Sequence, residues 1–205
     1  RNAEMTTDVV IIRTGTANLA SVVAAFGRAG RQVRVTSEPQ DVLGAERLVL
    51  PGVGSFGPVA GRIDDLGLRG PLVDRVNDGR PTLAICLGLQ ILATASEEDP
   101  GVAGLAILPT VATRFPSSVR VPQLGWNRVE AAPGSRVLED GYAYFANSFR
   151  LEEIPDGWSG ATSDHGGPFV AAVERGAVLA CQFHPELSGS WGQSLIERWL
   201  EVEPC

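Results

Sequence analysis

Apolar runs and helical spacings alternate along the first half of the chain. Four short runs of aliphatic and β-branched residues predict buried strands, at residues 8–12, 32–35, 47–50 and 82–85. Three segments between and after them predict helices, around residues 19–26, 66–77 and 87–94. Such alternation is typical of an α/β domain, in which a mostly parallel sheet carries helices on both faces.

The pattern changes beyond about residue 105, where strand-like runs become short and are separated by Gly and Pro. These runs lie at residues 110–114, 127–130, 142–147 and 169–173. They predict an antiparallel or mixed extension of the sheet. A strand at 178–183 and a helix at 191–200 follow, so we expect a three-layer α/β fold.

Composition and charge exclude several classes of protein. With 17 basic and 24 acidic side chains the net charge is −7, which argues against a nucleic-acid-binding surface. The apolar runs are far shorter than the roughly 20 residues of a membrane span, and residues 9–12 are too few for a signal peptide. Three cysteines cannot complete a disulfide framework, so we expect a cytoplasmic protein.

Residues 1–4 precede the only methionine, Met5, and we expect them to be foreign residues ahead of a native start. Residues 5–205 contain no repeat, low-complexity tract or linker. We therefore expect them to form one domain.

Cys86 stands where a predicted strand turns sharply into a predicted helix. The segment reads Ala84-Ile85-Cys86-Leu87-Gly88, and a residue at such a junction is held exposed at the carboxyl edge of a sheet. The partial positive charge of a helix N-terminus favours the thiolate. Cys86 is therefore a candidate nucleophile. The alternative is a buried cysteine that acts as a small hydrophobic side chain.

His184 follows the predicted strand 178–183 and would lie at the same sheet edge as Cys86 if their strands are parallel. A thiolate nucleophile needs a base that shuttles protons, and that base needs an acceptor that orients it. In an extended segment residues two apart point to the same side, so Glu186 can meet His184. The other histidine, His165, lies in a loop and is expected to be solvated.

The oxyanion of a tetrahedral intermediate needs two N–H donors. The N–H of Leu87 directly follows the candidate nucleophile. Val53 can supply the second, because the glycines at 52 and 54 let the backbone approach a substrate closely. A plain tight turn is the alternative for this loop.

These segments together resemble the class I, or triad, glutamine amidotransferases. The resemblance rests on AICLGLQ around Cys86, QFHPE around His184 and LPGVGSFG at 50–57. Within that family, three segments resemble the glutaminase subunits of imidazole glycerol phosphate synthase: TGTANLASVVAAF at 14–26, VPQLGWN at 121–127 and YFANSF at 144–149. They extend the likeness over nearly the whole chain.

The resemblance implies that the chain hydrolyses L-glutamine to glutamate and ammonia without a cofactor or metal ion. Cys86 would form a thioester with the substrate, His184 would act as acid and base, and Glu186 would orient the histidine. Further residues would line the glutamine pocket, namely Gly52, Gly54 and Gln90.

The resemblance also implies a partner. Ammonia would pass through a channel to a cyclase subunit with a TIM-barrel fold, where imidazole glycerol phosphate forms during histidine biosynthesis. A barrel alone needs about 250 residues, so we expect this 205-residue chain to form a heterodimer with it. Asn18, Trp126 and Asn127 are the predicted partner-facing residues, and the alternative is that Trp126 belongs to the core.

The sequence departs from the family pattern at several positions. Ala84 and Ala17 each stand where a glycine is usual, Gln123 and Asn147 stand where histidines are usual, and Leu187 replaces a lysine. The triad itself is intact. The alternative interpretations are another class I glutaminase subunit such as that of pyridoxal phosphate synthase, a γ-glutamyl or cysteine peptidase, and a non-catalytic binding subunit of the same fold.

Overall fold

A nine-stranded mixed sheet forms the centre of the described part of the chain, which comprises residues 9–15, 19–52 and 54–203 of the computed structural model. The strand order is β2-β1-β3-β4-β12-β11-β10-β7-β8. The parallel strands are β1 (Val9–Ile12), β2 (Val33–Thr36), β3 (Arg47–Leu50), β4 (Thr82–Ile85) and β12 (Val178–Cys181). The antiparallel strands are β7 (Gln123–Ala131), β8 (Gly141–Asn147), β10 (Ser159–Asp164) and β11 (Pro168–Arg175). A parallel sheet with an antiparallel extension is therefore confirmed, and the extension supplies four of these nine strands.

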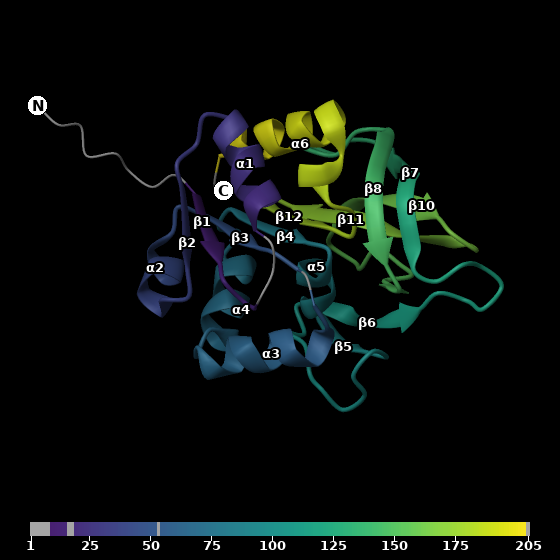
Figure 1. Cartoon of the computed structure of the whole chain (residues 1–205), viewed down its shortest axis with the longest axis horizontal. Coiled ribbons are helices and arrows are strands. Elements are labelled where there is room, and N and C mark those ends of the chain that lie inside the picture. The colour runs from purple at the N-terminus through teal and green to yellow at the C-terminus, as the bar shows by residue number, and fades with distance from the viewer. Residues whose placement is uncertain (1–8, 16–18, 53, 204–205) are drawn as a thin grey trace, which may run out of the picture.

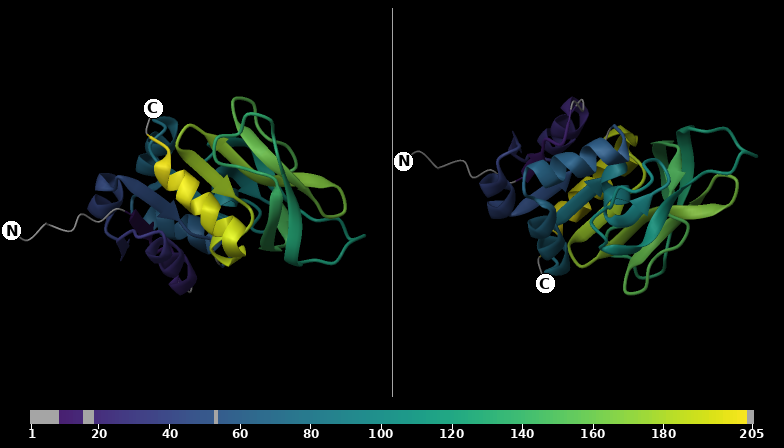
Figure 2. Two further views of the ribbon diagram at one scale, coloured as in Figure 1. Left: turned by 90° about the horizontal axis from the view of Figure 1, so that it is seen from above. Right: turned by 90° about the horizontal axis from the view of Figure 1, so that it is seen from below.

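Helices cover both faces of the parallel strands (Figure 1). One face carries α1 (Ala20–Arg28) and α6 (Gly189–Glu201), and the other carries α2 (Pro39–Gly44), α3 (Phe56–Asp65), α4 (Arg69–Asn77) and α5 (Leu87–Ile91). Figure 2 shows α6 across the sheet from above and α3 across it from below. No helix among the described residues is both long and apolar enough to span a bilayer.

Two hydrophobic cores fill the spaces between the layers. Alternate residues of a strand point to opposite faces of the sheet. In β1, Val9 and Ile11 therefore join the core under α1 and α6, whereas Val10 and Ile12 join the core under α2 to α5. Burial on both faces explains why this strand is apolar throughout, and the predicted three-layer architecture is confirmed.

Residues 51–57 are too rich in glycine for a regular element and predict a loop, but this prediction is wrong at its end, because α3 begins at Phe56. Phe56, Val59 and Ile63 lie on one face of α3 and are buried. Burial of that face outweighs the low helix propensity of Gly57 and Gly61. The glycine content of this segment alone indicated a loop.

The helix predicted at 87–94 is also too long, because α5 ends at Ile91. Residues Ala93–Ser96 form β5, which pairs in parallel with β6 (Leu108–Arg114), and β9 (Phe149–Arg150) joins them in a second, three-stranded sheet of the described residues. The short strands β5, β9 and β10 and the helix α2 were not predicted. Their stability comes from neighbours distant in the sequence, which a local pattern does not contain.

Buried Arg75 ties α4 to the segments that precede β3 and β4. Its guanidinium donates to the carbonyl oxygens of Ala45, Glu46 and Pro81 at 2.8–3.0 Å, and its Nε donates to Thr82 Oγ1 at 3.1 Å. A buried cation is tolerated only where its N–H groups are satisfied. These bonds fix the start of β4, the strand that leads to Cys86.

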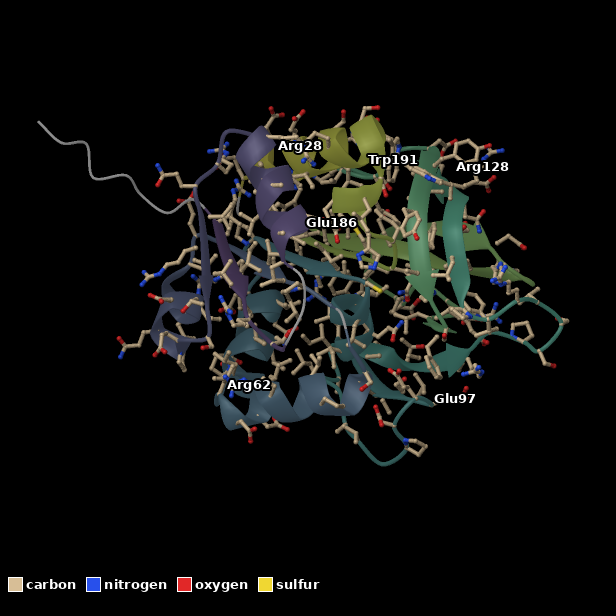
Figure 3. The ribbon with its side chains drawn as sticks, in the orientation of Figure 1. Arg28, Arg62, Glu97, Arg128, Glu186 and Trp191 are labelled. Carbon is tan, nitrogen blue, oxygen red and sulfur yellow. The ribbon has the colours of Figure 1, made fainter. Side chains whose placement is uncertain are left out.

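The substitution Arg75→Met removes all four hydrogen bonds and deprives the buried carbonyl groups of this donor. We expect the free energy of unfolding to fall by about 2–4 kcal/mol, measured by urea denaturation followed by tryptophan fluorescence. Arg62→Met, on the exposed side of α3 (Figure 3), is the control and should change it by less than about 0.5 kcal/mol. Equal stability of Arg75→Met and the wild-type protein would contradict this anchoring role.

Candidate active site

The carboxyl ends of β4 and β12 bring the predicted nucleophile and base together. The two strands are parallel neighbours with Ile85 opposite Cys181, and the N–H of Cys86 donates to the Cys181 carbonyl at 2.7 Å. His184 follows β12 by three residues, and it lines the same cavity as Cys86. The parallel arrangement assumed from the sequence is therefore present.

Cys86 occupies a strained turn between β4 and α5. Its φ of 52° and ψ of −107° lie in a region that side-chain-bearing residues rarely adopt, at a cost of about 1–3 kcal/mol. The turn directs the thiol into the cavity, as in the nucleophile elbow of hydrolases. The methyl group of Ala84 is buried in the core beneath the turn, so the fold accommodates this departure from glycine.

The loop after β3 packs backbone to backbone against the turn at Cys86. A Cβ atom at Gly52 would collide with the backbone nitrogens of Leu87 and Gly88, and one at Gly88 would collide with the Leu50 carbonyl oxygen. Close approach therefore requires glycine at both positions. The same contact places Gly52 beside the N–H of Leu87, the first predicted oxyanion donor.

His184 and Glu186 form a direct hydrogen bond, with 2.8 Å between Nδ1 and Oε1. The extended conformation from which this contact was predicted is wrong, because Pro185–Leu187 form a 3-10 helix, η1. The Tyr144 carbonyl accepts the His184 N–H at 2.9 Å, and Ser188 Oγ donates to the His184 carbonyl at 2.6 Å. The backbone is thus fixed on both sides of the ring. Figure 3 shows Glu186 near the centre of the molecule, between α1 and β8.

The pKa of His184 is raised by its partners. Burial of the ring by itself lowers this pKa. The hydrogen bonds of the ring to Cys86 and Glu186, together with the charges of these two residues, outweigh burial and raise the pKa from 6.5 to about 10. At neutral pH the ring is therefore an imidazolium beside the Cys86 sulfur. Such a pair supplies both a nucleophile and a proton for a leaving group.

A cavity of about 280 Å³ opens onto Cys86 and His184. Its other lining residues are Gly52, Gly54, Leu87, Gln90, Glu98, Ala146 and Ser148. Four of these were predicted site residues, namely Gly52, Gly54, Leu87 and Gln90. Two further predictions, Val53 as an oxyanion donor and Asn18 as a partner contact, fall outside the described residues.

Glu98 is a cavity residue that the sequence interpretation missed. Its Oε2 accepts the N–H of Phe56 at 2.9 Å, and Asp99 Oδ2 accepts the N–H of Gly57 at 2.7 Å. The two carboxylates cap the N-terminus of α3, where the side chain of the N-cap residue Ser55 makes no capping hydrogen bond. The run of acidic residues at 97–99 was a signal, but its neighbour α3 had not been predicted. Ala146 and Ser148, from YFANSF, were also missed as lining residues.

Trp126 and Asn127 lie on opposite faces of β7. Trp126 is 58% exposed, so the alternative that it belongs to the core is wrong. Its ring packs edge-on against Tyr144 of β8, whose backbone pairs with that of the cavity residue His184. Asn127 instead donates through Nδ2 to the Asp164 carbonyl at 2.7 Å. The two side chains therefore do not share one partner-facing surface.

His165 is not simply solvated, as the sequence led us to expect. It lies half-buried in the turn between β10 and β11, with Nε2 2.8 Å from the Arg120 carbonyl and its ring edge-on against Phe115 at 4.9 Å. It therefore serves the packing of this turn, and His184 is the histidine beside Cys86.

The sequence matches the family model "Glutamine amidotransferase class-I" over residues 10–201. The chain belongs to the class I glutamine amidotransferases. This amidotransferase is 41% identical to imidazole glycerol phosphate synthase subunit HisH of Methanothermobacter thermautotrophicus, over 95% of this chain and 98% of the relative. The subunit of the same name from Deinococcus radiodurans is 41% identical, over 97% and 95% of the two chains.

A plant relative of this amidotransferase is longer. Imidazole glycerol phosphate synthase hisHF of Arabidopsis thaliana is 37% identical over 94% of this chain, but only 34% of the plant protein is matched. Among solved structures, a glutamine amidotransferase has a TM-score of 0.75 at 21% identity, covering 94% of this chain and 97% of its own. PurLQS from Thermotoga maritima has a TM-score of 0.70 at 17% identity, covering 94% and 96%. At these identities the structural matches support the class I fold.

The raised pKa of His184 can be read directly, because this amidotransferase contains only two histidines. In NMR spectra of protein with ¹³C-labelled histidine, we expect the His184 signal to titrate near pH 10 and that of Cys86→Ala to titrate at lower pH. His165→Gln assigns the other signal. A His184 midpoint that does not fall in Cys86→Ala would contradict the pairing.

The raised pKa of His184 also determines how the stability of the fold depends on pH. Because the folded-state pKa lies above 6.5, the pair stabilises the fold fully below pH 6.5, and this contribution is lost as the pH rises through about 10.

Proposed function

We propose that this amidotransferase is the glutaminase subunit of imidazole glycerol phosphate synthase, which hydrolyses L-glutamine and supplies ammonia for histidine biosynthesis. The observation that carries the proposal is the Cys86–His184–Glu186 arrangement at one cavity. It occurs in a chain 41% identical to two proteins that bear the name of this subunit. We assign Cys86 as nucleophile, His184 as acid and base, and Glu186 as the residue that orients the ring.

The first half of the reaction uses the charged pair. The Cys86 thiolate attacks the side-chain amide carbon of glutamine, and the carbonyl oxygen gains the negative charge. The N–H of Leu87 and the Gly52–Gly54 loop, including Val53, would receive that oxyanion. His184 gives its proton to the amide nitrogen, the C–N bond breaks, ammonia leaves and a thioester remains.

The second half regenerates the enzyme. His184 is now neutral and removes a proton from water, which attacks the thioester carbon. The C–S bond breaks, the electron pair returns to Cys86, and glutamate leaves. The Nδ1 bond to Glu186 holds the same ring orientation in both halves.

The cavity offers groups that match the charged end of glutamine. Glu98 lines it, and we assign its carboxylate to the α-ammonium group of the substrate. Gln90 also lines the cavity, and both of its N–H groups are engaged, by Phe149 and Gln182. Its side-chain oxygen is therefore the atom left to accept a hydrogen bond from substrate.

The partner would be a cyclase subunit with a TIM-barrel fold, bound in a heterodimer in the cytoplasm. The plant hisHF protein supports a partner, because a region similar to this chain is part of a much longer polypeptide. An exposed apolar face borders the cavity on β7 and β8, formed by Leu124, Trp126 and Tyr142, which are 58–61% exposed, and by half-buried Tyr144. We assign this face, with Asn18, to the partner; Asn127 would contribute through the backbone of β7 only.

The function is tested by measuring glutamate release from glutamine with and without the barrel subunit and its ribonucleotide ligand. We expect the partner to stimulate turnover, and Cys86→Ala to lower it by at least about 10³-fold, because the thioester can no longer form. Cys205→Ala is the cysteine control and should retain activity. Turnover that survives Cys86→Ala would refute the mechanism. Stimulation by a pyridoxal phosphate synthase subunit instead would support the alternative glutaminase.

The partner-facing surface is tested with Trp126→Ala. An exposed Trp at the centre of an interface commonly contributes about 2 kcal/mol, so we expect Kd for the barrel subunit to rise by about 10- to 30-fold. Val111→Ala, which truncates an exposed apolar residue of β6, is the control and should leave Kd unchanged. Isothermal titration calorimetry measures both. An unchanged Kd in Trp126→Ala would place the interface elsewhere.

A further inference from the structure

A chain of buried amide groups runs behind the nucleophile. Gln182 directly follows β12 and is 0% exposed, and its Nε2 lies 3.7 Å from Cys86 Sγ. Its Oε1 accepts a hydrogen bond from Gln90 Nε2 at 3.1 Å. The same nitrogen of Gln90 donates to the Phe149 carbonyl at 3.0 Å. The amides therefore connect a backbone carbonyl of β9 with the reacting sulfur.

The Phe149 carbonyl group determines how the two side-chain amides are oriented, because its hydrogen-bonding role is unambiguous. The Phe149 carbonyl can only accept, so the Gln90 atom beside it is the NH₂ group. That NH₂ group must meet the carbonyl oxygen of Gln182, because two NH₂ groups would repel each other. The NH₂ group of Gln182 is then the one that faces the sulfur. The positions of O and N in a glutamine side chain are usually assigned from the hydrogen-bond network, and here the backbone carbonyl of Phe149 determines them for both amides.

The backbone end of the chain is itself held from two sides. The Phe149 carbonyl also accepts a hydrogen bond from Asn147 Nδ2 at 2.9 Å. Both lone pairs of this oxygen are therefore used. Gln90 cannot turn over without leaving a buried carbonyl with one donor fewer and a buried NH₂ group unpaired, which is costly.

We propose that Gln182 stabilises the Cys86 thiolate by donating an N–H group to its sulfur, and that Gln90 is the positioning residue that keeps this amide directed at it. The inference rests on the proposed function, because only a thiolate mechanism uses such a donor. It adds a residue to the triad, one that touches the reacting sulfur from within the core.

The amide acts on the sulfur in a way that His184 cannot. A hydrogen bond to the charged form of a group favours that form. The Ala146 carbonyl, 4.0 Å from the sulfur, can only accept and so favours the thiol. His184 loses its proton when ammonia leaves and gains one from water in the second half of the reaction, whereas the Gln182 amide keeps its N–H groups throughout. It is therefore still a donor when the C–S bond of the thioester breaks and the electron pair returns to sulfur.

Few charged groups face the sulfur among the described residues. They are His184, with Glu186 behind it, and Glu98 on the cavity wall. Each of them also contacts the substrate or the base in the proposed mechanism. Gln182 has no exposed surface and does not itself line the cavity, so its replacement acts on the sulfur and on Gln90 without removing a group that contacts the substrate. This separation makes the proposal testable.

The test is the pH dependence of iodoacetamide alkylation, followed by mass spectrometry of the peptide that contains Cys86, in a Cys205→Ser background. Cys181 reacts slowly, because burial raises the pKa of its thiol well above the ordinary value. In Gln182→Met, which has similar length but no N–H, we expect the midpoint of the Cys86 profile to rise by about one pH unit and the rate at pH 7 to fall about tenfold. In Gln90→Met the same changes should be smaller, about threefold in rate.

Gln123→Met is the matched control. Gln123 is also a buried glutamine, but it lies on β7, and no described group within hydrogen-bond distance partners its amide. We expect its alkylation profile to equal that of the wild-type protein. If Gln182→Met does not fold, as judged by circular dichroism, Gln90→Met carries the test, because it leaves Gln182 in place. A wild-type profile in the folded variant would overturn the proposal.

Kinetics provide a second readout that a merely structural role would not produce. With the barrel partner present, Gln182→Met should lower kcat about tenfold and change KM less than twofold, because it removes a contact to the sulfur and none to glutamine. A rise in KM with unchanged kcat would overturn the proposal. Alkylation requires neither glutamine nor partner, so a protein without glutaminase activity would refute the proposed function while the profiles still decide the role of Gln182.

Discussion

The parallel pairing of β4 and β12 is the contact on which the candidate active site depends. With Ile85 opposite Cys181, the residues that follow each strand leave the sheet at one edge, which brings together Cys86, Gln182 and His184. A shift of one residue in this register would turn the wrong side chains towards the cavity, because neighbouring residues of a strand face opposite sides. Burial of both strands on both faces makes such a shift costly.

A second contact, between the loop after β3 and the turn at Cys86, is made by backbone atoms. Gly52 and Gly88 let the loop after β3 and the turn at Cys86 meet through their backbones, so the N–H of Leu87 lies beside that loop. The positive φ of Cys86 is maintained by the surrounding core, including Ala84 and Leu87. Strain at the nucleophile is thus stabilised by packing elsewhere, which is common where a fold holds a reactive group in place.

Much of the site was predictable because it is local in the sequence. Cys86 stands at a strand-to-helix junction, and His184 and Glu186 are two residues apart, so short segments were sufficient to identify the three. The boundaries of β3 and β4 were predicted to the residue. Helix α3 was not, because its glycines favour a loop and only burial of Phe56 and Ile63 shows otherwise. Missing α3 also hid Glu98, whose place in the cavity depends on capping that helix.

By itself, the sequence determined the class of fold and singled out the three residues of the proposed triad, since apolar periodicity and residue type are properties of short segments. The tertiary structure decided how the parts act on one another. It showed that η1 brings Glu186 to the ring, that burial and charge set the pKa of His184, and that Gln182 points at the sulfur. These features depend on distances between residues up to about 100 positions apart, and a hydrogen bond or a charge acts through space, which the order of residues along the chain does not contain.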